Sequence, residues 1–288
     1  MDDILERHAV LRAEDVANKL AGITNDPQTF LRLFEVAMSH DGLIALAEDA
    51  PDGRGRVYST LDHVRAELQL SDLAARLALA EPARSADGSR LRALDPDRLV
   101  PIARDDRPAR KVPTLSEDQR AAYAHIFGPS RLSVITGIAG SGKSTLLSAV
   151  NIAAEVQGWR VVGTALAGKA VESLEKASGI RARSLAGLEA EFRLADETGT
   201  AVFDPRTILV IDEAGMIGTE QMTRVLTRAE AEGAKVVIVG DPDQLQPLEY
   251  GAPARVIADR VGAVELTSVW RQTDPGDRAA TFGLWKGG

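Results

Sequence analysis

Residues 137–144 have the types and spacing that bind phosphate, G-x-x-x-x-G-K-S, and they follow an apolar run at 132–136 and precede a helical pattern at 145–156. Glycines in such a loop let the backbone curl, so that its N–H groups and the N-terminus of the next helix hold phosphate oxygens. We expect Lys143 to reach the β- and γ-phosphates and the Ser144 hydroxyl to bind Mg²⁺. The loop residues expected to contact a nucleotide are Gly137, Gly140, Ser141, Gly142, Lys143, Ser144 and Thr145.

A pair of acids, Asp212 and Glu213, follows the apolar run at 207–211. A carboxylate at the carboxyl end of a parallel strand lies where ligands bind in α/β sheets. We expect Asp212 to hold Mg²⁺ and Glu213 to orient and deprotonate an attacking water. The second acid favours a hydrolase over a simple nucleotide binder.

Short Val- and Ile-rich runs alternate with helical patterns through residues 113–288. The predicted strands are 132–136, 160–164, 207–211, 235–239 and 263–266. Buried strands separated by helices predict a parallel sheet and an α/β fold. After the fourth strand comes G-D-P-D-Q, where Gln244 is a candidate contact to the γ-phosphate; the same residues also fit a plain type I turn.

Residues 1–82 have a different pattern, mostly helical with one hairpin. The predicted elements are helices at 15–21 and 30–38, strands at 43–46 and 56–59, and a helix from Thr60 to about residue 80. This order is the outline of a winged helix. Such a domain either binds DNA or serves only for packing, and the sparse polar side chains on the second helix favour packing.

The composition of the 288-residue chain excludes several classes of protein. It has no cysteine and four histidines, none at metal-ligand spacing, which excludes disulfide frameworks, thiolate zinc sites and catalytic thiols. The net charge of −8 excludes a globally basic nucleic-acid binder but not a locally basic groove. The apolar runs are too short to span a membrane and the acidic N-terminus lacks a signal-peptide core, so we expect a cytoplasmic protein without a membrane partner.

Six segments in order resemble the first RecA-like domain of superfamily 1 DNA helicases of the RecD-like branch. More narrowly, they resemble the helicase part of TraA-like (MobF-type) conjugative relaxases, over residues 113–273. The segments are LSEDQ at 115–119, GIAGSGKS at 137–144, TALAGKA at 164–170, IDEAGM at 211–216, GDPDQLQP at 240–247 and LTSVWRQ at 266–272.

The resemblance implies roles for five further residues. Gln119 would recognise adenine, and Arg271 would reach the γ-phosphate as an analogue of an arginine finger. Thr164 and Lys169 would touch the backbone of a DNA single strand. Ser184 falls where the family has another DNA-contacting motif, although the usual His-like position there is not evident.

The resemblance also implies an organisation and an activity. We expect a winged-helix-like accessory domain at 1–82, a linker at 83–112, and a RecA-like P-loop ATPase domain at 113–288 that uses ATP and Mg²⁺. The parent activity would be ATP-driven 5′-to-3′ translocation on single-stranded DNA for plasmid transfer. A second RecA-like domain is expected to be missing, so the chain is interpreted as a truncated piece whose partners include that domain or other conjugation proteins.

The chain departs from the family in one further respect, and two rival functions remain. The only tyrosines are Tyr58, Tyr123 and Tyr250, and no histidine cluster exists, so the chain lacks the residues for nicking DNA as relaxases do. One rival is a nucleotide-dependent DNA-binding module without catalysis. The other is a small-molecule P-loop kinase, which Gln119, Gln244 and Arg271 argue against.

Overall fold

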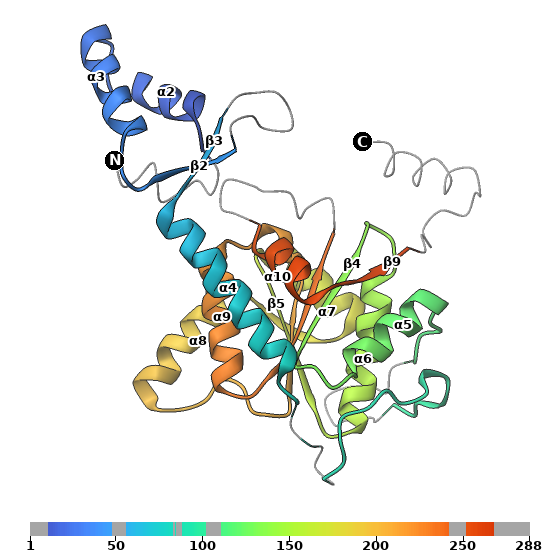
Figure 1. The fold of residues 1–288 in the computed structure, drawn as a ribbon. Helices are drawn as coiled ribbons and strands as arrows, with labels where there is room; N and C mark the ends of the chain where they lie inside the picture. Colours follow the sequence, from blue (N-terminus) through green and yellow to red (C-terminus); the bar gives the residue numbers. More distant parts are fainter. Residues whose placement is uncertain are drawn as a thin grey trace, which may run out of the picture.

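A six-stranded sheet forms the centre of the molecule in the computed structural model, which describes residues 11–47, 56–82, 84, 88–101, 111–241 and 252–267 (Figure 1). All its strand pairs are parallel. In spatial order the strands are β6 (Arg181–Ser184), β5 (Arg160–Ala165), β7 (Thr207–Ile211), β8 (Lys235–Gly240), β4 (Leu132–Gly137) and β9 (Val264–Leu266). The predicted α/β fold with a parallel sheet is therefore confirmed.

Helices cover both faces of this sheet, which explains why its inner strands are mostly apolar. One face packs on α5 (Glu117–Ile126), α6 (Lys143–Val156) and α7 (Gly168–Ser178). The other face packs on α4 (Leu61–Leu79), α8 (Leu185–Thr198), α9 (Thr219–Ala231) and α10 (Pro253–Val261). Along β7, Ile208 and Val210 belong to the first core and Leu209 and Ile211 to the second, as the two-residue period of a strand requires.

The strands predicted from apolar runs agree with the structure within a residue or so at each end, and α6 begins at Lys143, two residues before the predicted start. The strand β6 was not predicted. It is a four-residue edge strand, and Arg181 and Arg183 interrupt any apolar run. Because an edge strand is half open to solvent, its sequence need not be apolar.

The N-terminal elements appear in the predicted order of helix, helix, hairpin and helix. They are β1 (Leu11–Arg12), α2 (Ala13–Ala21), α3 (Pro27–Met38), β2 (Leu43–Ala47), β3 (Val57–Thr60) and then α4. Strand β3 lies between β1 and β2 in a small antiparallel sheet. In Figure 1 this small unit lies at the upper end of α4, away from the large sheet.

Helix α4 belongs to both parts of the molecule. Thr60 caps its N-terminus, where the side chain accepts a hydrogen bond from the His63 amide. Its C-terminal half is buried against α9 and α10, with Leu70, Leu73, Ala74 and Leu77 in the second core. The domain boundary expected after residue 82 stays a prediction, and the long shared helix ties the small unit to the large one.

Part of the expected linker lies on the large unit. Leu91 is buried in the core under α5 and α6, and the short 3₁₀ helix η1 (Pro96–Arg98) follows. The side chain of Arg120 on α5 donates to both carboxylate oxygens of Asp97. The backbone N–H of Arg92 donates to the Gln157 Oε1, and the Gln157 Nε2 donates to the Arg92 carbonyl.

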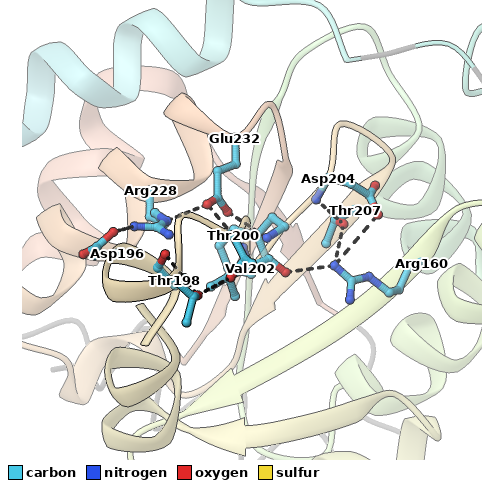
Figure 2. Close-up of polar contacts among 11 residues, drawn as sticks. Arg160, Asp196, Thr198, Thr200, Val202, Asp204, Thr207, Arg228 and Glu232 are labelled. Atoms are coloured by element: carbon cyan, nitrogen blue, oxygen red, sulfur yellow. Dashed lines mark hydrogen bonds and ion pairs between the residues drawn. The ribbon is translucent and has the colours of Figure 1, made fainter. Parts of the chain in front are cut away.

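A polar network closes the edge of the sheet where β5 and β7 begin. Figure 2 shows Arg228 of α9 between Asp196 of α8 and Glu232. The Glu232 carboxylate in turn accepts the backbone N–H groups of Val202 and Phe203, at 3.2 and 2.7 Å. The network therefore fastens the connection from α8 to β7 onto the end of α9.

Among the described residues, no helix is long and apolar enough to cross a membrane.

Candidate nucleotide-binding site

The loop from β4 to α6 has the backbone of a phosphate cradle. Gly140 and Gly142 have φ angles of 85° and 83°, a left-handed conformation that side chains with a Cβ rarely adopt. The Ser141 amide donates to the Ile138 carbonyl at 3.1 Å and tightens the turn. Gly142 is the N-cap of α6, so the first N–H groups of a 14-residue helix face the loop. This arrangement binds anions through backbone N–H groups and the positive helix end.

Lys143 is the first residue of α6, and its side chain folds back over the loop. The Nζ atom donates to the carbonyl oxygens of Gly137 and, at 3.0 Å, of Ile138. Its charge also acts on Asp212, since it lowers the pKa of that carboxyl. A cation is therefore held between the loop and the acidic end of β7.

Asp212 and Glu213 follow β7 at the same edge of the sheet. The Asp212 amide donates to the Thr164 carbonyl at 2.9 Å, which extends the pairing of β5 with β7 by one step. Burial raises the pKa of Asp212; the Glu213 amide, which donates to its Oδ1 at 3.0 Å, and the Lys143 charge act against this rise. The carboxylate is thus partly desolvated beside a cation, which strengthens its electrostatic interactions.

Glu213 has a strained backbone. Among the described residues it is the only one other than glycine with a positive φ, 52°. The short 3₁₀ helix η2 (Ala214–Met216) begins directly after it, with Ala214 and Gly215 buried. Such strain persists where the surroundings enforce it and concentrates at functional sites.

The residues fit a magnesium ion bound together with phosphate. Mg²⁺ takes hard oxygen ligands and is usually bound by one or two carboxylates or hydroxyls with substrate phosphates and water. The Asp212 carboxylate, with its raised pKa, and the half-buried Ser144 hydroxyl provide such oxygens. No group of three or more His, Cys, Asp or Glu that could hold a metal occurs in the described part of the chain.

Gln119 lies at the other side of the loop, on α5. It is 2% exposed and forms a capping box with Ser116, whose amide donates to its Oε1 at 3.0 Å. Its Nε2 donates to the Gly142 carbonyl at 3.2 Å. The amide thus joins the start of α5 to the phosphate loop, and its expected contact with adenine stays a prediction.

The residues expected to contact DNA lie near the same sheet edge but differ in exposure. Lys169 is exposed in the first turn of α7. Ser184 is the N-cap of α8, where its Oγ accepts the Gly187 amide at 3.2 Å. Thr164 is fully buried, and its hydroxyl has no hydrogen-bond partner. Burial argues against a direct contact between the Thr164 side chain and a DNA backbone.

Two predicted site residues, Gln244 and Arg271, lie outside the described residues. Their roles therefore stay predictions. The structure also singles out Asp118, which sequence reasoning had not considered by itself. Its carboxylate accepts the Thr267 amide at 2.9 Å, and only its position inside the LSEDQ segment could have drawn attention to it.

The sheet and the site together define a class of protein. A parallel sheet buried on both faces, a glycine loop leading from β4 into α6, and an acid at the end of β7 are the parts of a P-loop NTPase domain with a RecA-like fold. Residues 114–288 match the family model described as AAA domain, and the chain belongs to this family.

Similarity extends to longer proteins. The chain is 37% identical over 288 residues to the conjugal transfer protein TraA of Rhizobium radiobacter, a match that covers 100% of this chain and 25% of that protein. It is 36% identical over 236 residues to the ATP-dependent RecD2 DNA helicase of Deinococcus radiodurans, covering 81% of this chain and 30% of that protein. These identities confirm the resemblance that six motifs had indicated.

Among solved structures, the Pif1 helicase from Candida albicans aligns with a TM-score of 0.42 and 21% identity, over 60% of this chain and 44% of that chain. The chain spans about a quarter of the length of its TraA relatives, since the match covers 25% of the Rhizobium radiobacter protein.

Proposed function

We propose that this chain is the ATP-binding and ATP-hydrolysing motor domain of a superfamily 1 DNA helicase, within a conjugative relaxase-helicase that acts on single-stranded DNA. The observation that carries the proposal is the phosphate cradle itself: left-handed Gly140 and Gly142, Lys143 at the start of α6, and Asp212 at the end of β7. A loop-bound ammonium acts on a partly buried carboxylate across the point where a phosphate cradle ends. The names of the relatives, conjugal transfer protein TraA and ATP-dependent RecD2 DNA helicase, support the choice of DNA over a small-molecule acceptor.

Each site residue is assigned a role in binding or hydrolysing ATP. The N–H groups of the loop and α6 bind the phosphates, and Lys143 leaves the loop carbonyls to neutralise the β- and γ-phosphate charge. Ser144 and Asp212 hold Mg²⁺, which when bound offsets the charge on the transferring phosphoryl group. Glu213 orients the attacking water and takes its proton. Gln119 is assigned to adenine, and Gln244 and Arg271 to the γ-phosphate.

The DNA-binding part of the proposal concerns residues at the carboxyl ends of the neighbouring strands β5 and β6. Lys169, in the first turn of the helix that follows β5, is an exposed cation. Ser184 is the last residue of the neighbouring strand β6 and the N-cap of α8. A single strand of DNA would be bound mainly through its phosphates, so its affinity falls with salt. A second RecA-like domain or other conjugation proteins are the proposed partners, and the cytoplasm is the proposed location.

The test is phosphate release from Mg-ATP, with and without single-stranded DNA. Release that DNA stimulates and Lys143→Ala abolishes would support the proposal. Nucleotide-dependent DNA binding without any release would instead favour a non-catalytic DNA-binding module, the second candidate. Lys169→Ala should weaken DNA binding and reduce its salt dependence, whereas Lys176→Ala, an exposed lysine at the far end of α7, serves as the matched control.

A further inference from the structure

Met216 is an exposed apolar residue next to the acidic end of β7. Its side chain is 49% exposed, whereas its neighbours Gly215 and Ile217 are buried. Ala214 and Ile217 pack in the core formed with α4, α8, α9 and α10, but Met216 is outside both cores. The fold therefore gains little from this side chain. Single exposed apolar residues are common on protein surfaces, so only the position of Met216 can point to a role.

A closed turn fixes Met216 beside the two acids. The Met216 amide donates to the Glu213 carbonyl at 3.1 Å, and the Ile217 amide donates to the Ala214 carbonyl at 3.3 Å. These bonds form η2 directly after the carboxyl end of β7. Among the described residues, Met216 is the exposed large apolar residue that follows the carboxyl end of a large-sheet strand most closely. Its side chain is therefore presented at the end of the sheet where the proposed function places nucleotide and DNA.

Three neighbouring strands bring Met216 into line with the residues assigned to DNA. Strand β5 lies between β6 and β7. Ser184 ends β6, Lys169 lies in the first turn of the helix after β5, and Met216 lies in the turn after β7. Neighbouring strands are about 4.8 Å apart, so these three strand ends span about 10 Å. A single strand of DNA that crosses this end of the sheet can reach all three residues at once.

The charges along this line differ from strand to strand. Beyond β5, the exposed Lys169 attracts phosphate groups. Beyond β7, the carboxylates of Asp212 and Glu213 repel them. A base has no net charge and has apolar faces, so it lies beside these acids at less cost than a phosphate. The charge pattern therefore favours phosphates near α7 and a base near η2.

We propose that Met216 packs against a base of the DNA single strand whose phosphates Lys169 binds. This inference rests on the DNA-binding part of the proposed function. Bases of single strands usually stack on aromatic side chains, but the exposed large apolar residues of the described chain include no aromatic. A methionine can take that place, since its polarizable sulfur makes favourable contacts with aromatic rings. Such a contact holds any base, so it adds affinity without a strong preference for sequence.

Two DNA probes separate a contact with a base from a contact with a phosphate. One is a strand of thymidine nucleotides, and the other is an abasic strand of the same length, with the same phosphates and no bases. Their affinities are measured at a fixed concentration of a non-hydrolysable ATP analogue. We expect Met216→Ala to bind the thymidine strand about two- to tenfold more weakly than the wild type, the range of sulfur–ring contacts, and to bind the abasic strand equally well. Met216→Leu, which keeps an apolar side chain of similar size, should lose less affinity than Met216→Ala.

Leu194→Ala is the matched control for removal of an exposed apolar side chain. Leu194 is 58% exposed in the second half of α8, away from the strand ends, and its loss should leave both affinities unchanged. Lys169→Ala should weaken binding of both probes and reduce the slope of log affinity against log salt by about 0.7, the value for one phosphate contact with a single strand. Met216→Ala should leave that slope as in the wild type.

Equal losses of affinity for the two probes in Met216→Ala would overturn the proposal, since a base contact acts on the thymidine strand alone. No loss for either probe would also overturn it, and would assign the exposed methionine to contact with a protein. Both outcomes leave the DNA-binding function intact, because the wild type still binds. A wild-type chain that binds neither probe would instead contradict the proposed DNA-binding function, and this inference with it.

Discussion

The ammonium of Lys143 donates a hydrogen bond to the carbonyl oxygen of Ile138 at 3.0 Å, so this side chain lies against its own loop. The carbonyl of Gly137 accepts a second bond from the same atom. In the proposed function, a phosphate in the cradle would offer the ammonium anionic oxygens in place of these neutral acceptors, and hydrogen bonds to anionic oxygens are stronger. The contacts with Gly137 and Ile138 thus keep the lysine in place without a large cost of release.

Lys143→Ala should therefore abolish phosphate release and leave the fold intact. The lost contacts are hydrogen bonds to the carbonyls of buried Gly137 and half-buried Ile138, so we expect the free energy of unfolding to fall by about 1–3 kcal/mol. Phosphate release and urea unfolding, measured side by side, check this. Lys176→Ala is the control for removal of a lysine, and turnover by Lys143→Ala at the wild-type rate would contradict the assignment of the site.

Glu213→Gln should separate binding from chemistry. The substitution keeps the size of the side chain and the backbone N–H that bonds Asp212, but it removes the proposed base. We expect kcat to fall by about 10²–10⁴-fold, the range of general-base catalysis, with the affinity for Mg-ATP nearly unchanged. Single-turnover phosphate release with a nucleotide-binding titration tests both. A loss of affinity as large as the loss of kcat would assign Glu213 to binding.

Whether a site residue was predictable depends on how far apart in the sequence the interacting residues lie. The phosphate loop was predictable because its glycines, lysine and serine all lie within residues 137–144, and their spacing alone indicates the backbone conformation. The same holds for Asp212 and Glu213, which follow a strand that is visibly apolar. Contacts such as Asp118 with Thr267 could not be predicted, because the residues are 149 positions apart.

Burial of polar residues was also beyond reach of the sequence. Thr164 lies one position before the end of β5, where a polar residue is as easily exposed at the end of the sheet as buried under the next helix. Strand β6 was not predicted because its two arginines interrupt the apolar pattern by which a strand is recognised. Lys235 begins an apolar strand, and nothing in its neighbours indicates that it is fully buried.

Buried Lys235 and Arg131 are two neighbouring cations at the end of the sheet where β8 and β4 begin. The phosphate loop follows the opposite end of β4. Its Nζ donates to the carbonyls of Gly128 and Ser130, while Arg131 donates to the carbonyls of Ala229 and Ala234 near the end of α9. Burial, and then the charge of Arg131, lower the pKa of Lys235 to about 7.

This lowered pKa predicts that the protein becomes more stable as the pH rises above 7. The unfolded lysine has a pKa of about 10.4, so from about pH 7 to 10 the unfolded state binds more protons, and the free energy of unfolding increases with pH. Below about pH 7 both states are protonated and the cost of the buried charge stays constant. We expect a rise of roughly 2 kcal/mol or more between pH 7 and 9.5, since one pKa unit corresponds to about 1.4 kcal/mol.

Urea unfolding at pH 7 and 9.5 measures this rise. Lys235→Met should remove it and should be more stable than the wild type at pH 7, because it replaces a buried charge with an apolar side chain. Two other groups act outside this window. Burial lowers the pKa of His125 and raises that of Tyr123, so the first matters below about pH 6.5 and the second above about pH 10. A slope that Lys235→Met leaves unchanged would assign the effect elsewhere.

Two arginines on α9, one turn apart, offer a matched comparison of ion pairs. Arg228 is 18% exposed and bonds Asp196 and Glu232 (Figure 2). It also lies over the Phe192 ring, at 5.4 Å from the ring centroid. Arg224 is 52% exposed and bonds Glu189. Arg228 is therefore more shielded from solvent, and its removal leaves Glu232 half-paired at the connection between α8 and β7.

We expect Arg228→Ala to lower the free energy of unfolding by about 2–3 kcal/mol, because it removes shielded charge-assisted hydrogen bonds and a cation–π contact. Arg224→Ala should cost less than about 1 kcal/mol, as is usual for an exposed pair. Urea unfolding of the two variants at one pH measures the difference. Phosphate release by folded Arg228→Ala should match the wild type, since the network lies where β5 and β7 begin and the phosphate loop follows the other end of β4. Equal losses of stability in the two variants would show that the network adds nothing beyond a surface ion pair, and a selective loss of turnover would connect it to the site.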